Sequence, residues 1–252
     1  MSKSFVDKRR DQIVHLLQER TEMTVAELAV HFGTSQLTIR RDLNHLQDAG
    51  MLVRSYGTAR LAEGPAGQAG TLALQSKQAI ARYAAGLIED GETIFINTSS
   101  TALAIMDFIT ARNVTIVTNN GHALQQSIPP EITVLLTGGE IRVPKWSMTG
   151  DFALATIGQI QATKCILGCS GISAERGLTT IVAQEMRVNA LMLSRSLHRI
   201  VVTDSSKVGA DASFKYGDVS QIDTFITDTG ATQDGIESLK HAGAGNIICV
   251  TP

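Results

Sequence analysis

The chain has 252 residues, a mass of 26.9 kDa and 43% hydrophobic residues, enough to bury the core of one large domain or of two unequal ones. Only 18% of the residues are charged and the mean hydropathy is +0.07, but no apolar run approaches the roughly 18 residues of a membrane span, so we exclude a transmembrane protein and expect no membrane partner. The polar start lacks the apolar stretch of a secretory signal, so we expect a cytoplasmic protein. Three cysteines without a Cys-x-x-Cys pair, and histidines without ligand spacing, predict no metal site and no cofactor.

The net charge of −2 is unevenly distributed along the chain. Residues 1–60 contain nine Lys and Arg against seven Asp and Glu, whereas residues 61–252 contain thirteen against seventeen. We therefore expect two parts with different partners. A mildly basic first part is by itself weak support for nucleic-acid binding, because affinity for DNA depends on where the cations lie.

The first part of the chain is predicted to form three helices. Apolar residues recur at helical spacing over residues 8–17, which predicts the first of them. Thr24 offers the N-cap of a short second helix, with Glu27 as its partner in a capping box. Gly33 ends that helix, and Ser35 caps a third helix whose apolar residues fall at i, i+4 and i+7. Two helices joined by a Gly-containing turn predict a helix-turn-helix.

Polar side chains that suit DNA recognition lie off the apolar stripe of the third predicted helix. Arg donates two bonds to a guanine edge, Gln and Asn pair with adenine, and hydroxyls and cations anchor phosphates. A solvated helix face is the alternative. Alternation over residues 51–61 around a Gly predicts a β-hairpin behind this helix, a wing whose Arg54 and Arg60 can touch the DNA backbone, and this context favours DNA binding. The predicted DNA-binding residues are Ser35, Gln36, Thr38, Arg40, Arg41, Asn44, Arg54 and Tyr56.

This region also resembles a known signature. The segments concerned are Thr38-Ile39-Arg40-Arg41-Asp42-Leu43, Leu46, Gly50 and Arg54-Ser55-Tyr56-Gly57. They are similar to the N-terminal signature of DeoR-type bacterial transcriptional regulators. The resemblance implies that Thr38, Arg40 and Arg41 lie on or beside the DNA-reading helix. It also implies that Asp42 orients an arginine. Family members usually carry a second Gly after Gly57, where this chain has Thr58, which leaves the geometry of the wing tip open.

A segment over residues 62–74, rich in Gly and Ala with one Pro, is predicted to be a flexible joint. Beyond it, helices are expected near residues 75–89, 101–109, 121–127, 152–160, 182–196 and 234–242, and strands at 93–96, 114–117, 133–136, 164–167, 199–202, 224–226 and 246–250. This alternation predicts a mainly parallel sheet covered on both faces. We therefore expect an α/β protein, with an N-terminal winged helix-turn-helix domain over residues 1–61, a linker over 62–74 and a larger Rossmann-like α/β effector domain over 75–252.

Small and polar residues follow five of the predicted strands, where a parallel sheet binds its ligands. These segments are 97–101, 118–120, 137–140, 168–171 and 203–207. Backbone N–H groups at helix starts, together with hydroxyls, form an anion site suited to a phosphate, and Ser99, Ser100 and Thr101 match it best. Such residues are also normal in loops and caps, but five such loops at one edge favour a binding site.

The same part of the chain resembles the C-terminal effector domain of DeoR-type regulators. The matching segments are Asp90-Gly91-Glu92-Thr93-Ile94, 98–101, Thr118-Asn119, Gly138-Gly139, Gly171, Gly177-Leu178-Thr179 and Asp204-Ser205-Ser206-Lys207. That domain is similar to ribose-5-phosphate isomerase, and the resemblance implies sensing of phosphorylated sugars or related metabolites. The predicted effector-binding residues are Asn97, Thr98, Ser99, Ser100, Thr101, Asn119, Gly138, Gly139, Arg142, Gly171, Glu185, Asp204 and Lys207. Many members carry Asp and Gly in place of Asn97 and Ser99, so the first loop and the ligand can differ from theirs.

The sequence also has to be compared with an enzyme. The positions of Glu185, Asp204 and Lys207 along the chain resemble those of the acid, base and phosphate-binding residues of such an isomerase. The isomerases also carry an Asp-rich segment and a Lys-Gly-Gly-Gly run, which this chain lacks. General acid–base catalysis needs both partners placed and tuned. We therefore expect a sensor and not an enzyme, with a sugar-phosphate isomerase-like enzyme as the alternative.

These patterns predict a transcriptional regulator of double-stranded operator DNA, most simply a repressor of a sugar or polyol catabolic operon that is controlled by a phosphorylated sugar or polyol effector. A homodimer or homotetramer is expected, because one helix in one groove gives modest affinity. The single tryptophan, Trp146, follows the Gly138-Gly139 turn. It could close over a ligand or pack between subunits, and the sequence leaves both alternatives open.

Overall fold

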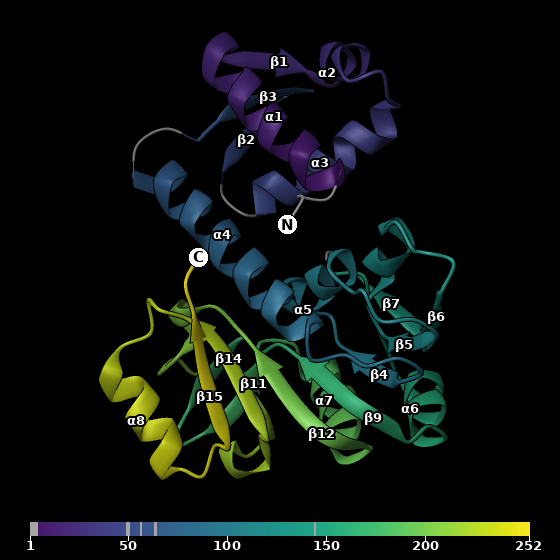
Figure 1. Cartoon of the computed structure of the whole chain (residues 1–252), viewed down its shortest axis with the longest axis vertical. Coiled ribbons are helices and arrows are strands. Elements are labelled where there is room, and N and C mark those ends of the chain that lie inside the picture. Colours follow the sequence, from purple (N-terminus) through teal and green to yellow (C-terminus); the bar gives the residue numbers. More distant parts are fainter. Residues whose placement is uncertain (1–4, 49–50, 56, 63–64, 144) are drawn as a thin grey trace. The chain divides into compact units, whose positions relative to one another are not determined.

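Three helices, a small antiparallel sheet and the first part of helix α4 (Pro65–Ala85) belong to the first of two units (Figure 1). The structure, a computed structural model, describes residues 5–48, 51–55, 57–62, 65–143 and 145–252. The two units are Met1–Gln75 and Ser76–Pro252. The elements of the first unit are α1 (Phe5–Arg20), β1 (Glu22–Thr24), α2 (Val25–His31), α3 (Gln36–Asp48), β2 (Leu52–Ser55) and β3 (Thr58–Leu61), with the strands in the order β1-β3-β2.

Local sequence signals and a shared core explain the first unit. Thr24 and Glu27 form the predicted capping box at the start of α2, and the Ser35 hydroxyl accepts a hydrogen bond from the backbone N–H of Thr38 (3.1 Å) in the first turn of α3. Apolar residues of all three helices and of the hairpin share one buried core; they are Ile13, Leu17, Leu28, Ile39, Leu43, Leu46, Leu52 and Ala59. The three predicted helices and the hairpin are confirmed. Strand β1 was not predicted, because three residues are too few for an alternation to show.

Helix α4 (Pro65–Ala85) corrects the flexible joint predicted for residues 62–74: residues 65–74 are helical. Pro65 is the first helical residue, where its fixed φ is favourable, and the Ala, Leu and Gln residues of the segment favour a helix despite its Gly residues. Leu74 is buried in the core of the first unit, so tertiary packing adds to local propensity. Neither α4 nor any other helix in the described ranges is long and apolar enough to cross a membrane.

Seven parallel strands form the main sheet of the second unit, in the order β15-β14-β12-β9-β4-β5-β6 (Figure 1). The strands are β4 (Thr93–Ile96), β5 (Val114–Thr118), β6 (Ile132–Leu136), β9 (Ala162–Leu167), β12 (Ser196–Val202), β14 (Thr224–Asp228) and β15 (Asn246–Val250). The chain runs from β4 outward to β6 and then returns to place β9 on the other side of β4. The strand order therefore reverses between β4 and β9, and open parallel sheets bind ligands outside the carboxyl ends of the strands at such a reversal.

Alternate residues of the strands belong to two separate cores, as the two-residue period of a strand requires. Ile94 and Ile96 of β4 lie in one core, whereas Phe95 lies in the other. The second half of α4, with α5 (Ser100–Leu103) and η1 (Ala104–Asp107), contributes to the first core. Helices α6 (Asp151–Gly158), α7 (Ala183–Ser194) and α8 (Gln233–His241) contribute to the second. The predicted parallel sheet with cover on both faces is confirmed.

Two small antiparallel sheets carry no signal in the sequence, because their strands are three or four residues long. Strands β7 (Glu140–Arg142) and β8 (Ser147–Thr149) pair as the β7–β8 hairpin. Strands β10 (Gly171–Ser173), β11 (Gly177–Thr180) and β13 (Phe214–Gly217) pair in the order β10-β11-β13. The helix expected near 121–127 is a short 3-10 turn, η2 (Gly121–Gln125), and further 3-10 turns are η3 (Ser205–Lys207) and η4 (Val219–Gln221).

Candidate functional site

Helix α3 presents a polar stripe to solvent. Gln36, Arg40 and Asn44 are all exposed, and their four-residue spacing places them on one side of the helix. Ile39 and Leu43 on the opposite side are fully buried, so the core fixes which side faces out. This exposed stripe offers the donors and acceptors that read base edges. Ser35 is the predicted cap of α3: its hydroxyl accepts from the Thr38 N–H (3.1 Å) and lies 3.0 Å from the Thr38 hydroxyl.

Asp42 lies on the buried side of α3 and accepts two charged hydrogen bonds from α1. Arg9 Nε donates to Asp42 Oδ2 (2.6 Å) and Arg10 Nε donates to Asp42 Oδ1 (3.1 Å). The inference that Asp42 orients an arginine is confirmed, although both partners come from α1 and neither from α3. The three side chains connect α1 to α3 directly after Arg40 and Arg41 in the chain.

The wing is connected to α3 by a pair of residues that were both predicted to touch DNA. Arg54 of β2 donates from Nη1 to Asn44 Oδ1 of α3 in a close contact. This bond fixes the hairpin against the reading helix and aligns both side chains at one surface. Tyr56 and Gly50 lie outside the described residues.

The loop after β4 is bonded to the loop after β9, at the reversal of the strand order. Asn97 Nδ2 donates to the Gly168 carbonyl (2.9 Å) and to Asn189 Oδ1 (3.2 Å), while Asn97 Oδ1 accepts from the backbone N–H groups of Gly168 (3.0 Å) and Ser99 (3.2 Å). These four bonds occupy both donors and the acceptor of the amide. Asn97 therefore fixes the loop after β4 against the loop after β9. These two loops belong to the rim, by which we mean residues 97–101, 118–120, 137–140, 168–171 and 203–207, which lie at the carboxyl ends of five strands. The amide of Asn97 has no hydrogen-bonding group left for the predicted contact with an effector.

The predicted phosphate loop follows Asn97 directly. Ser99 is the N-cap of α5 and accepts from Ala102 N (3.3 Å), Ser100 is exposed, and Thr101 is buried. A Cβ at Gly168 would lie 2.0 Å from Ser99 Oγ, so only glycine after β9 lets the two loops approach. Ser100 is the hydroxyl of this run that remains open to a ligand.

Two further loops at the rim have mainly structural contacts. Gly139 has φ of +103°, and a Cβ there would lie 2.3 Å from the Thr149 carbonyl oxygen, so this glycine lets β7 approach β8. Arg142 is exposed and pairs with Glu140 (2.9 Å) on its own strand. Gly138, Gly171 and Thr98 add backbone to the rim, and neither glycine has a side chain with which to bind.

The loop after β12 brings a carboxylate and a cation to the same edge of the sheet. Asp204 caps η3 by accepting from the Ser206 N–H (3.2 Å), and Lys207 ends that turn, half-buried. Asp228 at the end of β14 accepts from the Ser205 N–H (2.7 Å) and hydroxyl (2.8 Å). Asp204 is bonded within its own turn, and its negative charge does not attract an anion. Lys207 is therefore the charged group of this loop that can bind one.

Glu185 lies in the first turn of α7 and is almost completely buried. Its Oε2 accepts from the Thr180 hydroxyl (3.1 Å), and Lys145 Nζ of the β7–β8 hairpin is 3.5 Å away. Trp146, the residue after Lys145, is exposed and has a φ of +53°. Its ring centroid lies 6.0 Å from that of His122. Neither alternative for Trp146 is tested by these contacts. The sequence analysis did not identify Lys145 and Thr180 as partners of Glu185, because no pattern in the sequence connects these segments.

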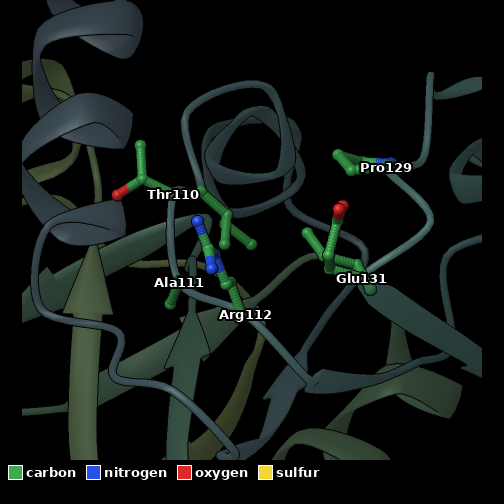
Figure 2. A pocket seen from close by; sticks show the side chains of 7 residues that line it. Thr110, Ala111, Arg112, Pro129 and Glu131 are labelled. Atoms are coloured by element: carbon green, nitrogen blue, oxygen red, sulfur yellow. The ribbon is translucent and has the colours of Figure 1, made fainter.

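A surface hollow lies at the opposite edge of the sheet. It has a volume of about 220 Å³ and is lined by Ile109, Thr110, Ala111, Arg112, Pro129, Glu131 and Ile132. Figure 2 shows Arg112 on one side of it and Pro129 and Glu131 on the other. The lining residues precede β5 or β6, except Ile132, which is the first residue of β6. The hollow is therefore at the amino ends of these strands, and none of the predicted effector-binding residues belongs to it. Ligands of parallel sheets bind at the carboxyl ends, and we do not assign the effector to this hollow.

The comparisons with known proteins agree with this division of the chain. Residues 9–64 match the DeoR-like helix-turn-helix domain and residues 73–229 match the DeoR C terminal sensor domain. The chain is 31% identical over 230 residues to the glycerol-3-phosphate regulon repressor of Escherichia coli (strain K12), covering 88% of this chain and 90% of that protein. It is 28% identical over 229 residues to the lactose phosphotransferase system repressor of Staphylococcus epidermidis (strain ATCC 12228 / FDA PCI 1200), covering 87% and 91%. A solved structure, the full-length sorbitol operon regulator SorC from Klebsiella pneumoniae, matches with a TM-score of 0.35 at 13% identity, over 82% of this chain and 91% of that one.

A helix-turn-helix with an exposed reading stripe, joined to a sensor domain with a polar rim, defines a DNA-binding transcriptional regulator. The chain belongs to the DeoR family of such regulators. It is a regulator and not an enzyme, so the isomerase alternative is not supported. Among the residues that the structure describes, no three His, Cys, Asp or Glu side chains come together as metal ligands do.

Proposed function

We propose that this protein represses a sugar or polyol catabolic operon and that a phosphorylated sugar or polyol controls it. Relatives named as repressors of glycerol-3-phosphate and lactose phosphotransferase genes support this proposal. The observation that carries it is the exposed stripe of Gln36, Arg40 and Asn44 on α3, in one chain with a polar rim at the reversal of a parallel sheet. As a DNA-binding regulator, it would act in the cytoplasm.

In this proposal residues 1–61 bind the operator, residues 75–252 bind the effector, and residues 62–74 connect these two domains. The stripe on α3 lies in a major groove, Arg41 and the Thr38 hydroxyl contact phosphates beside it, and Arg54 of the wing contacts the backbone. One such head contacts only a short site, so at least two heads are needed for specific binding. A homodimer or homotetramer meets that need.

The effector in this proposal is held at the carboxyl ends of the strands. Ser100 and the backbone after β4 take its phosphate together with Lys207, because hydroxyls, N–H groups and a cation are the partners that phosphate prefers. Binding of the effector and binding of the operator are linked. The factor by which the effector binds more tightly to DNA-free protein must equal the factor by which it lowers the affinity for the operator. Glycines 138, 139 and 171, together with Thr98 and Thr101, shape the loops around it.

The DNA arm of the test measures fluorescence anisotropy of a promoter fragment from the neighbouring genes across a salt titration. Arg40→Ala should raise Kd about 5- to 150-fold, since a base contact is worth about 1–3 kcal/mol. Arg41→Ala should weaken binding and lower the salt slope by about 1, as expected of a phosphate contact. Lys240→Ala, an exposed cation on α8, is the matched control and should leave Kd unchanged. Absence of salt-sensitive binding to any such fragment would refute the proposal.

The effector arm measures the rise in Tm that sugar phosphates cause and follows whether they are consumed. A compound that stabilises without turnover supports a sensor, because ligand binding to the folded state alone raises Tm. Ser100→Ala and Lys207→Ala should reduce that rise, whereas Arg40→Ala should leave it intact. Loss of the rise in Arg40→Ala as well would show that the reading helix has been misplaced.

A further inference from the structure

Three polar atoms near the rim are buried and have no hydrogen-bond partner within the described ranges: Asn119 Oδ1, Ser147 Oγ and Glu185 Oε1. The exposed fractions of these residues are 0%, 0% and 2%. They come from three different elements, namely the end of β5, the start of β8 and the first turn of α7. Buried polar atoms are almost always paired in folded proteins, so three together call for an explanation.

Contacts through the β7–β8 hairpin bring the three residues into one neighbourhood. Asn119 Nδ2 donates to the Met148 carbonyl (3.1 Å), and the Met148 N–H donates to the Asn119 carbonyl (2.8 Å). Ser147, the residue before Met148, pairs with Asn120. On the other side, Lys145 Nζ lies 3.5 Å from Glu185 Oε2, and α7 packs against β8. The hairpin therefore joins the end of β5 to the start of α7.

The chemistry of the three atoms selects a donor as their partner. An ionised carboxylate oxygen can only accept. The free atom of Asn119 is its oxygen, because the amide nitrogen is committed to the Met148 carbonyl, which cannot donate. The Ser147 hydroxyl can donate or accept. A phosphate does not suit these atoms, because its oxygens are acceptors and would face acceptors. An ammonium group does not suit them either, because the positive charge of the neighbouring Lys145 would repel it.

We propose that Asn119 Oδ1, Ser147 Oγ and Glu185 Oε1 bind hydroxyl groups of the effector, at the end of the ligand away from its phosphate. This inference rests on the proposed function, since it assigns the part of the same ligand that the phosphate loop does not hold. Vicinal hydroxyls of a polyol or sugar supply the donors that two acceptors need, and Ser147 can bond to the same group. The β7–β8 hairpin, through Ser147 and Lys145, then belongs to the sensing site.

The test compares thermal stabilisation by glycerol 3-phosphate, ribose 5-phosphate and glucitol 6-phosphate with that by propyl, pentyl and hexyl phosphate, which have the same chain lengths without hydroxyls. In the wild-type protein at least one hydroxylated compound should bind at least tenfold more tightly than its alkyl counterpart. Ser147→Ala and Glu185→Gln should each remove most of that difference and leave the affinity for the alkyl phosphate unchanged.

The matched control is Thr227→Val, which removes another buried hydroxyl without a partner among the described residues. Thr227 is on β14, four strands from β5 in the sheet order, or about 19 Å at the usual strand spacing. Without ligand, neither Ser147→Ala nor Thr227→Val should lower Tm, because neither removes a hydrogen bond; with ligand, only Ser147→Ala should weaken the response. A fall in Tm specific to unliganded Ser147→Ala would indicate a structural hydroxyl and overturn the inference.

The remaining outcomes separate this site from the proposed function. Equal stabilisation by hydroxylated and alkyl phosphates, or discrimination that survives both variants, would overturn the hydroxyl site and leave a phosphate-controlled regulator. Failure of all six compounds to stabilise the protein would overturn the phosphorylated effector itself and this site with it.

Discussion

Replacing Asp42 with Asn should loosen the reading helix from α1. The Asp42 side chain is 2% exposed, and the two arginine side chains that donate to it from 2.6 and 3.1 Å are each 12% exposed. Removing one partner of a buried ion pair costs about 3–5 kcal/mol, because the remaining charges stay buried without compensation. Asn retains one acceptor oxygen and can keep one of the two bonds, so we expect a loss of about 2–3 kcal/mol in the local stability of α1 and α3.

Amide hydrogen exchange followed by mass spectrometry measures this loss in the full-length chain. A loss of about 2–3 kcal/mol corresponds to exchange roughly 30- to 150-fold faster, since each 1.4 kcal/mol is a factor of about ten. Peptides from α1 and α3 should show it, whereas peptides from the seven-stranded sheet should not. Glu19→Gln on α1 is the control: Glu19 is 61% exposed and pairs only with His15 at 3.6 Å in the described part of the chain, and exposed pairs contribute little. Unchanged exchange in the Asp42→Asn variant would refute the reasoning.

DNA binding by the Asp42→Asn variant distinguishes two effects of Asp42: its role in holding α3 in place and its negative charge. Removing a negative charge from the head would by itself strengthen attraction to the phosphate backbone. Loss of the contact that anchors α3 acts in the opposite direction, because the stripe is then held less firmly for the groove. We expect weaker binding, measured by anisotropy at fixed salt. Tighter binding would show that Asp42 acts only as a charge.

Two further predictions concern the sensor domain. Gly139→Ala should lower stability by more than about 2 kcal/mol in thermal unfolding, because its Cβ would lie 2.3 Å from the Thr149 carbonyl oxygen; Gly138→Ala, with open space around its Cβ position, should cost about 1 kcal/mol of backbone strain, and equal losses would contradict the clash. Iodoacetamide at pH 8 should modify the exposed Cys249 and spare Cys165, because burial raises the pKa of the Cys165 thiol to about 12 and the thiolate is the reactive form; alkylation of both at similar rates in the folded protein would oppose this.

Short-range patterns in the sequence predicted helix α3 and its buried side correctly. The spacing of Ile39 and Leu43 marks the buried side of α3, and Gln36, Arg40 and Asn44 then follow on the exposed side by helical geometry alone. The alternation of helices and strands predicted the parallel sheet in the same way. Each of these inferences depends on residues a few positions apart, which is the range over which helical and strand periods operate.

Contacts between distant segments were outside that range. Asp42 meets Arg9 across 33 residues and Asn97 meets Gly168 across 71, and nothing local distinguishes these pairs from exposed polar residues. Asn97 was therefore assigned to the effector, although four hydrogen bonds to distant and neighbouring segments occupy its amide. The flexible joint over residues 62–74 was wrong for a related reason, since composition undervalued a helix that the burial of Leu74 helps to stabilise.

The sequence by itself determined that this protein has a helix-turn-helix and an α/β body with polar loops after its strands, because helical and strand periods, caps and turns are written in neighbouring residues. Only the tertiary structure decided the strand order, which reverses between β4 and β9. It also decided which polar atoms at the rim are already paired and which are free. That depends on packing and hydrogen bonds between segments far apart in the chain, whose energies are settled when the whole domain folds.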